Sequence, residues 1–393
     1  MHRRTAAWVS VVAAVAMSFG GASTAAARQP IARGCGDAWT VAPQPAFTGS
    51  GGLDDIAALS VTDAWAVGGV FTQTDQVGHT LIEHHDGTSW SAVPSVDGPN
   101  SSQSSLSGVV PLAANDVWAA GTYIRADNLI RTLIEHWDGT VWSRVKSPNA
   151  GHPAGGELSD IDGVVADDVW AVGGYGQGAP GRTLIEHWDG TAWTVVPSPN
   201  KGPYPNSLTD VVAVAPVDAW AIGTWFTKAF VDRTLVLHWD GTKWRRVPSP
   251  NAGSSRTPND LESISAVAAD DIWAVGTRGL HTLTVHWDGV SWSVNSSPTP
   301  GGNADLAGVT AVGPADVWAV GGRVDRVANA IQTLVEHWDG TAWSVVESAN
   351  KGPSDNHLWG VAAAPGRMFA VGYRFAGSGL GSTVPLTLER CGV

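Results

Sequence analysis

The chain has 393 residues and a formal net charge of −13 at pH 7, and after its first residues the basic side chains are adjacent only at Arg245–Arg246. Such an acidic chain is poorly suited to a phosphate backbone, which excludes nucleic acid as a partner. No apolar run has the about 20 residues that a membrane-spanning helix needs, so no membrane span is expected.

Residues 1–27 have the pattern of a secretory signal peptide. Arg3 and Arg4 give a basic start, Ala6–Phe19 form a short apolar run, and Ala25–Ala27 match a small-residue cleavage site. We therefore expect the signal to be removed and residues 28–393 to be secreted into an oxidising, extracellular compartment.

Two phrases then recur at a nearly fixed period. The first, Asp-x-Trp-Ala-x-Gly, has its tryptophan at Trp65, Trp118, Trp170, Trp220, Trp273 and Trp318, with spacings of 53, 52, 50, 53 and 45 residues. The second reads HWDGTxW at His136–Trp142, His187–Trp193, His238–Trp244 and His337–Trp343, and is looser at His84–Trp90 and His286–Trp292. A period in this range indicates stacked units that bury a face against their neighbours.

Each repeat contains four short segments rich in Val, Ile, Trp and Thr. Examples are Leu208–Val214, Asp168–Gly173, Thr183–Trp188 and Trp193–Val196. They are bounded by Gly, Pro, Asn or Asp-Gly, which are strand and hairpin signals. Four strands in each radial repeat predict an all-β fold, a β-propeller with four-stranded blades.

A seventh repeat is split between the chain ends. Arg367–Gly372 and Pro385–Gly392 match the second and third segments, and Cys35–Pro45 align with the missing fourth. The sequence thus predicts seven blades, with the last formed by 358–393 and 35–45. Cys35 and Cys391 both fall at the Asp of the motif, so we expect them to form a disulfide. In the chain-entropy model it would contribute on the order of 4–5 kcal/mol.

The order of these motifs resembles kelch-type repeats, in which a strand ending in Gly-Gly precedes an aromatic strand and a Trp-bearing outer strand. AVGG occurs at Ala66–Gly69, Ala171–Gly174 and Ala319–Gly322. The resemblance covers about residues 35–393 and implies a seven-bladed propeller similar to kelch domains and to the central domain of galactose-oxidase-like proteins. The HWDGTxW phrase departs from the usual kelch pattern, which favours a distinct bacterial-type subfamily.

Most repeated side chains are expected to be structural. A tryptophan at the same register in every blade should pack blade against blade. The motif histidines lie in six different blades, so a hydrogen bond to a turn backbone or to the repeated Asp is expected, and no metal site. The Asp of the Asp-x-Trp phrase should cap a turn. No cofactor is expected either.

Candidate ligand-binding residues lie where blades differ, on the face formed by the second-to-third-strand and inter-blade connections. The second position after the Asp-x-Trp-Ala-x-Gly phrase holds Tyr123, Tyr175, Trp225, Arg278, Arg323 and Arg374, and Trp359, Asp55, Asp160 and Asp210 belong to the innermost strands. We expect them to converge near the channel mouth, where they would suit a glycan or an acidic peptide. The alternative is that the aromatics only anchor loops.

The leading hypothesis is a secreted, monomeric binding module for a glycan or an extracellular protein. The alternative is a carbohydrate-active enzyme, such as a polysaccharide lyase or an oxidase-like protein, and a third possibility is a structural protein of the cell surface. The oxidase implied by the resemblance needs a Cys–Tyr cross-link and copper, whereas both cysteines are assigned to closure. A pocket enclosed by Asp55, Asp160, Asp210 and a histidine would favour an enzyme, and exposed aromatics would favour binding.

Overall fold

The computed structural model describes residues 36–149, 155–176, 181–377 and 382–392. The chain divides into two compact units, Met1–Ile31 and Ala32–Val393. The expected signal peptide and Cys35 lie outside the described residues. The regular secondary structure of the described part of the second unit is β-strand apart from short 3-10 turns, and no helix in it is both long and apolar enough to cross a bilayer.

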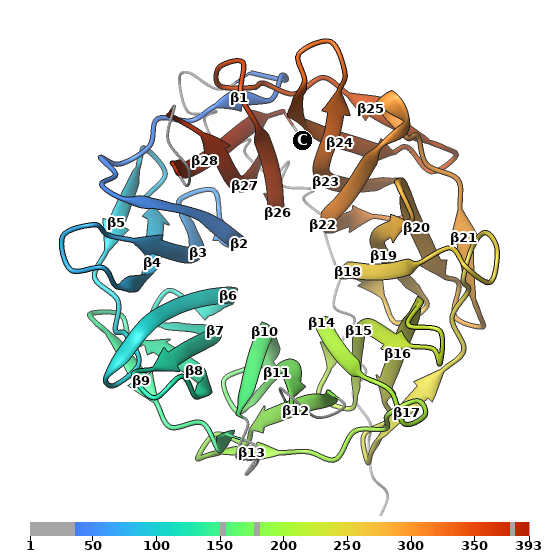
Figure 1. Cartoon of the computed structure of the whole chain (residues 1–393), viewed down its shortest axis with the longest axis horizontal. Helices are drawn as coiled ribbons and strands as arrows, with labels where there is room; N and C mark the ends of the chain where they lie inside the picture. The colour runs from blue at the N-terminus through green and yellow to red at the C-terminus, as the bar shows by residue number, and fades with distance from the viewer. Residues whose placement is uncertain (1–35, 150–154, 177–180, 378–381, 393) are drawn as a thin grey trace, which may run out of the picture. The chain divides into compact units, whose positions relative to one another are not determined.

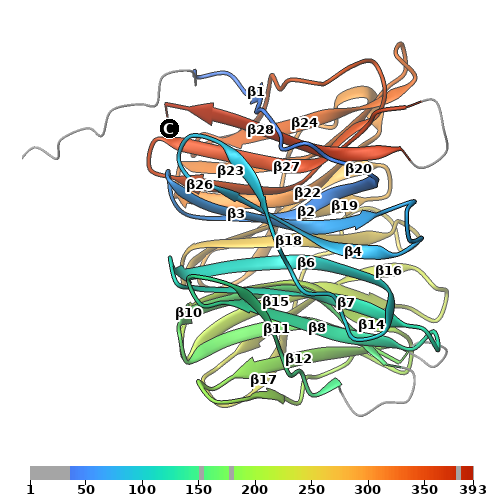
Figure 2. The same ribbon diagram turned by 90° about the vertical axis from the view of Figure 1, so that its left-hand side faces the viewer.

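Seven four-stranded antiparallel blades surround a central channel (Figure 1). One parallel bridge, between Gly78 and Gln103, links the sheets of blades 1 and 2. From the side, neighbouring blades lie face to face (Figure 2). This arrangement agrees with the predicted all-β propeller of seven four-stranded blades.

In blades 1 to 7 the strands are as follows, from the channel outward. The innermost strands are β2 (Ser50–Ser60), β6 (Ser101–Ala113), β10 (Gly156–Val165), β14 (Asn206–Ala215), β18 (Asn259–Ala268), β22 (Ala304–Gly313) and β26 (Asn356–Ala364). The second strands are β3 (Asp63–Phe71), β7 (Asp116–Arg125), β11 (Asp168–Tyr175), β15 (Asp218–Phe226), β19 (Asp271–Arg278), β23 (Asp316–Asp325) and β27 (Arg367–Phe375). The third strands are β4 (Gly78–His85), β8 (Ile130–Trp137), β12 (Arg182–Trp188), β16 (Asp232–Trp239), β20 (His281–Trp287), β24 (Ala330–Trp338) and β28 (Thr383–Cys391). The outermost strands are β5 (Trp90–Val93), β9 (Trp142–Val145), β13 (Trp193–Val195), β17 (Trp244–Val247), β21 (Trp292–Asn295), β25 (Trp343–Val346) and β1 (Thr40–Val41), and a 3-10 turn, η2 (Pro300–Gly302), precedes β22.

The two ends of the described chain meet in blade 7. β1 pairs antiparallel with β28, with Thr40 opposite Glu389 and Val41 opposite Leu388. This is the pairing that the alignment of the chain ends predicts. The Cys391 N–H also donates to the Gly36 carbonyl over 2.8 Å. Because Cys35 lies outside the described residues, the Cys35–Cys391 disulfide stays a prediction.

Tryptophans pack each blade against the next, as predicted. The Trp65 ring on β3 lies 5.3 Å from Trp137 and 5.4 Å from Trp142, which belong to the third and fourth strands of the next blade. The same contacts recur for Trp118 with Trp188 and Trp193, Trp170 with Trp239 and Trp244, Trp220 with Trp287 and Trp292, and Trp273 with Trp338 and Trp343. The cores are therefore shared between neighbouring blades.

The motif histidine and the Asp of the Asp-x-Trp phrase hydrogen-bond within each of the first six blades. In blade 1 the His84 Nε2 lies 2.9 Å from Asp63 Oδ1, which also accepts from Trp65 Nε1 at 2.9 Å. The equivalent pairs are His136–Asp116, His187–Asp168, His238–Asp218, His286–Asp271 and His337–Asp316. The expected histidine bond is confirmed, but the expectation that this Asp caps a turn is wrong. Turn capping belongs to the hairpin Asp, as Asp138 Oδ1 accepts from the Thr140 N–H at 2.8 Å.

Truncation of a shared tryptophan should destabilise the fold strongly. Trp170 is 1% exposed and lies between two blades, so Trp170→Ala should lower the free energy of unfolding by roughly 3–5 kcal/mol. Urea-induced unfolding would measure the loss. Val327→Ala, at a side chain that is 99% exposed, is the control and should change little. A loss below about 1 kcal/mol for Trp170→Ala would contradict the shared-core account.

Candidate functional site

The channel is lined by one bulged residue from each blade. On every innermost strand the pairing with the second strand shifts by one residue just after a buried leucine, for example between Leu53 and Asp55 on β2. We call these seven bulged residues the bulge ring: Asp54, Ser107, Ser159, Thr209, Glu262, Ala307 and Trp359. All seven line a central cavity of about 470 Å³. The bulge ring is therefore the natural place for a ligand.

In blades 1, 3, 4 and 5 the residue after the bulge joins its blade to the next. Asp55 Oδ2 accepts the Val109 N–H at 2.9 Å, across the boundary of blades 1 and 2. The same bond is made by Asp160 with Val211 at 3.1 Å, by Asp210 with Ile264 at 2.8 Å and by Ser263 with Val309 at 3.2 Å. In blade 2 this position is Gly108, where a Cβ atom would lie only 2.4 Å from Asp160 Oδ1. These aspartates line the cavity and also fasten its wall.

Carboxyl groups dominate the chemistry of the cavity. Asp54, Asp55, Asp160, Asp162, Asp210 and Glu262 line it, and none of the described lysines or arginines does. Desolvation raises the pKa of Asp54, Asp55, Asp162 and Glu262 to about 7. Asp54 and Glu262 remain open to channel water, although protein surrounds them closely. No group of three or more metal-ligating side chains among the described residues is placed to hold a metal ion.

Asp160 and Asp210 form a carboxyl pair in this wall. Desolvation and the adjacent Asp210 charge raise the pKa of Asp160 well above its ordinary value, and the two side chains hydrogen-bond to each other. Such a bond requires that the two carboxyls share one proton. The free oxygens of the pair accept backbone N–H groups of the next blade. The pair is therefore held in place by the scaffold on both sides.

Trp359 brings an aromatic face to the cavity. It is 41% exposed and is the one exposed tryptophan among the described residues. Its ring centroid lies 4.2 Å from His357 and 6.3 Å from Tyr373. His357 is buried and its Nε2 lies 2.7 Å from Asp305 Oδ2. The Trp359 ring is thus supported from behind while it stays accessible.

The structure brings together four of the ten predicted ligand-binding residues. Trp359, Asp55, Asp160 and Asp210 line the central cavity. Tyr123, Tyr175, Trp225, Arg278, Arg323 and Arg374 do not, because they lie on the second strands, one strand away from the channel. The predicted aromatics and arginines of the second strands thus do not line the central cavity, and their part in ligand binding stays a prediction.

The six remaining residues have separate surroundings. Tyr123 is buried and lies against Gly98 of the inter-blade connection. Trp225 is covered by the Lys201 ammonium, 4.0 Å from its ring centroid. Tyr175 lines a pocket of about 180 Å³ between blades 3 and 4, and Arg374 lines one of about 240 Å³ that includes Glu83. Arg278 and Arg323 are half-buried and lie opposite Asn259 and Ala304 in their blades.

Most of the bulge ring could have been found from a third repeated phrase. Leu-x-(Asp, Gly or Ser)-(Ile or Val) occurs in every blade, as LDDI, LSGV, LSDI, LTDV, LESI, LAGV and LWGV. The x position is the bulge. A bulge adds one residue to the strand and so changes the face to which the following side chains point. A prediction that assumes strict alternation along the strand does not detect this change.

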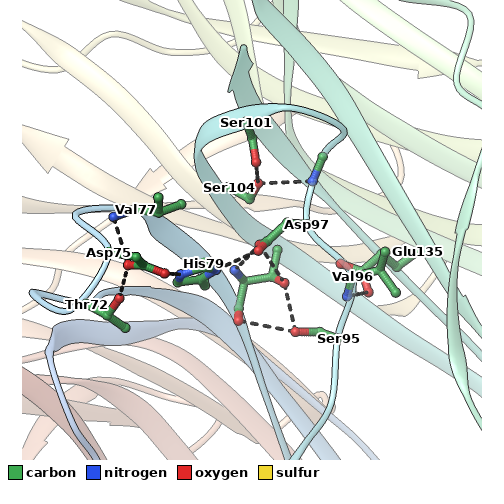
Figure 3. Close-up of polar contacts among 12 residues, drawn as sticks. Thr72, Asp75, Val77, His79, Ser95, Val96, Asp97, Ser101, Ser104 and Glu135 are labelled. Carbon is green, nitrogen blue, oxygen red and sulfur yellow. Dashed lines mark hydrogen bonds and ion pairs between the residues drawn. The ribbon is translucent and has the colours of Figure 1, made fainter. Parts of the chain in front are cut away.

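A second polar cluster fixes the loops between blades 1 and 2 (Figure 3). The His79 Nδ1 lies 2.6 Å from Asp97 Oδ2, and its Nε2 lies 3.0 Å from Asp75 Oδ2. These two carboxylates raise the pKa of His79. Asp97 Oδ1 also accepts the Thr80 N–H at 2.9 Å. The loop after β3 and the connection to blade 2 are therefore bound to one imidazole.

No family model matches the sequence, and none of the curated proteins matches it. Among solved structures the chain is similar to YCF48 bound to D1 peptide, at 14% identity over 90% of this chain and 97% of that chain, with a TM-score of 0.55. It is also similar to YCF48 from Cyanidioschyzon merolae, at 14% identity over 90% and 99%, with a TM-score of 0.53. A polysaccharide lyase of family PL25, an ulvan lyase bound to -[GlcA(1-4)Rha3S]-, shares 8% identity over 88% and 95%, with a TM-score of 0.56. These likenesses concern the propeller fold alone, and the kelch-type resemblance stays a prediction.

Buried carboxyls should make the protein less stable as the pH rises. Besides the cavity groups, burial raises the pKa of Glu83 and Glu186 to about 7 and of Glu135 and Glu336 to about 8, from 4.5. A raised folded pKa means that the native state binds protons more tightly, so stability is full below about pH 4.5 and is lost as the pH approaches 8. His85, with a pKa lowered to about 4, opposes this trend as a single group. Thermal unfolding should therefore occur at a lower temperature at pH 8 than at pH 5.

The Glu135→Gln variant isolates one of these groups. Glu135 is fully buried, with Oε2 accepting the Val96 N–H at 3.1 Å and Oε1 unpaired. Because glutamine cannot ionise, the variant avoids the cost of a desolvated carboxylate, so it should raise the free energy of unfolding at pH 8 by roughly 1–3 kcal/mol and change it little at pH 5. An equal effect at both pH values would contradict the assignment.

Proposed function

We propose that this protein is a secreted, monomeric β-propeller module that binds a glycan in its central cavity. The observation that carries the proposal is the position of Trp359, the exposed tryptophan of the described chain, inside a cavity lined by carboxyl and hydroxyl groups. A concave site with an aromatic face and a few polar groups is the usual form of a small-ligand pocket.

The bulge ring supplies the two kinds of contact that a sugar requires. The Trp359 face offers an apolar platform for the C–H face of a pyranose ring. Asp54 and Glu262 can accept hydrogen bonds from sugar hydroxyls, and the Ser107 and Ser159 hydroxyls can donate and accept. The Thr209 hydroxyl donates to the Leu261 carbonyl at 2.7 Å and can only accept from a sugar. Hydrogen bonds to ionised acceptors are stronger than those between neutral groups.

The charge of the cavity restricts the sugar. Six carboxyl groups and none of the described basic side chains line it, so an anionic sugar would be repelled when those carboxyls ionise. The acidic peptide considered from the sequence loses its support, because Arg278, Arg323 and Arg374 lie outside the cavity. Neutral and amine-bearing sugars fit this environment.

The alternative function is a carbohydrate-active enzyme on the same scaffold. It would need a carboxyl pair or a base positioned at the bond that reacts. Asp55, Asp160 and Asp210 are instead engaged by backbone N–H groups. None of the described histidines lines the cavity. Binding therefore has better support than catalysis.

Replacement of Trp359 should remove binding. In calorimetric titrations with neutral, amine-bearing and uronate oligosaccharides, the wild type should bind members of the first two groups and reject the third. Trp359→Ala should weaken the affinity at least about tenfold, which corresponds to about 1.4 kcal/mol. Phe230→Ala removes an aromatic side chain that is 67% exposed and outside the cavity, so it serves as the control.

Preference for uronate oligosaccharides, or equal binding by wild type and Trp359→Ala, would overturn the proposed site. A lysine-rich peptide belongs in the same panel, because the carboxyls and Trp359 could also receive a cationic side chain. Binding of that peptide alone would assign a protein partner in place of a glycan.

Secretion and closure can be tested on the intact mass of the exported protein. Cleavage after Ala27 predicts a mature chain that starts at Arg28. The Cys35–Cys391 disulfide predicts that the unreduced mass is lower by the two thiol hydrogens. Thiol labelling of the unfolded, unreduced protein should then modify neither cysteine. A retained signal segment or two labelled cysteines would contradict these predictions.

A further inference from the structure

We propose that the glycan site extends from the central cavity into a groove between blades 1 and 2, so that it receives an oligosaccharide chain rather than a single sugar. This inference rests on the proposed glycan-binding function. The groove is a second cavity, of about 340 Å³, lined by residues of β2, β3, β4 and β6. It shares Asp54 with the central cavity. One carboxyl group thus belongs to both spaces.

One glycine, Gly69, keeps this groove free of a side chain. Gly69 on β3 stands where blades 2, 4 and 5 carry Thr122, Thr224 and Thr277. Gly52 on β2 also lines the groove, but a Cβ atom there would lie 3.1 Å from the Tyr373 Cβ atom of blade 7, so this glycine faces the other neighbour. A Cβ atom at Gly69 would lie 3.2 Å from the Ser105 Cβ atom. The missing side chain at Gly69 thus leaves space that threonine fills in blades 2, 4 and 5, whereas blades 3 and 6 carry Gly174 and Gly322 at this register.

An aromatic side chain stands at each end of the combined site. Phe71, the last residue of β3, lines the groove and is 42% exposed, while Trp359 lines the central cavity. Between them lie Asp54, Ser105 and the side chain of Gln103, which is exposed. Aromatic faces separated by hydrogen-bonding groups suit successive sugar units of one chain.

The walls of the groove are fixed before any ligand binds. His79 follows Gly78, which lines the groove, and its imidazole joins the loop after Phe71 to the connection that leads to blade 2 (Figure 3). On the opposite wall Ser104 accepts the Gly98 N–H at 3.1 Å. A groove with ordered walls binds a chain without the cost of ordering loops.

The test compares chain length with site variants, using the full chain and calorimetry. The probes are β-1,4-linked glucosamine oligomers of one to six units and the N-acetylated series of the same lengths. For the wild type we expect affinity to rise by about tenfold or more from one unit to four in at least one series, and then to level off. Phe71→Ala should remove the gain with length and leave the affinity for one unit unchanged.

A second variant fills the groove with a side chain that the fold accepts elsewhere. Gly69→Thr introduces the residue found at this register in three other blades, and it should also remove the gain with length. Phe230→Ala, an exposed aromatic in the same kind of connection in blade 4, should keep the wild-type profile. Trp359→Ala should weaken binding at every length.

The outcomes separate the two proposals. If wild-type affinity is independent of length, or if Phe71→Ala and Gly69→Thr keep the wild-type gain, the groove is not part of the site, while the glycan function stands. If the folded wild type binds neither series at any length, the glycan-binding function itself is overturned, and the extended site with it. Unfolding curves that match the wild type would show that each variant is folded.

Discussion

The burial of one tryptophan by the neighbouring blade is the constraint on which the rest of this structure depends. Trp65 contacts His84 of its own blade at 4.2 Å, but its remaining faces are covered by Trp137 and Trp142 of the next blade. A single blade would leave that ring in water and lose about 25 cal/mol for each Å² exposed. Each blade therefore requires a successor. The series of blades must therefore form a closed circle, and the pairing of β1 with β28 completes its last blade.

In blade 7, where the two chain ends meet, other residues stand at the Asp, His and Trp positions of the repeated motifs. Arg367 stands at the Asp position and pairs with Glu389 at the His position, so the donor and acceptor strands are exchanged. Arg390 takes the place of a tryptophan, with its guanidinium 4.5 Å from the Trp318 ring. Phe369 fills the second-strand position. Two residues of the candidate site flank this closure, Trp359 of blade 7 and Asp54 of blade 1, although all seven blades line the central cavity. Departures from the repeat thus mark both the closure and the site.

The sequence predicts the scaffold better than the site, for a physical reason. The spacing of the motifs predicts the strands, the shared tryptophans and the meeting of the chain ends, because each of these depends on residues that recur in every blade, such as Trp65. The site instead depends on the bulges of the innermost strands and on which connections cover a side chain. Asp54 faces the channel because the register shifts after Leu53, and Tyr123 is covered by a connection that passes over Gly98. Neither effect follows from alternation along a strand, so the sequence alone does not show which of the predicted residues line the cavity.

The carboxyls of the cavity wall favour a role beyond structure. In blade 5 Ser263 makes the same inter-blade hydrogen bond as Asp210 does in blade 4, and it carries no ionisable group. The bond therefore does not require a carboxyl. Asp55 and Asp162, with pKa values near 7, lower stability at neutral pH because their charged forms are poorly solvated. Groups that destabilise a scaffold without being needed by it are expected where a ligand makes use of them. Asp55 and Asp162 each accept one backbone N–H of the next blade, and a sugar hydroxyl or ammonium in the cavity would add a further donor to such carboxylates.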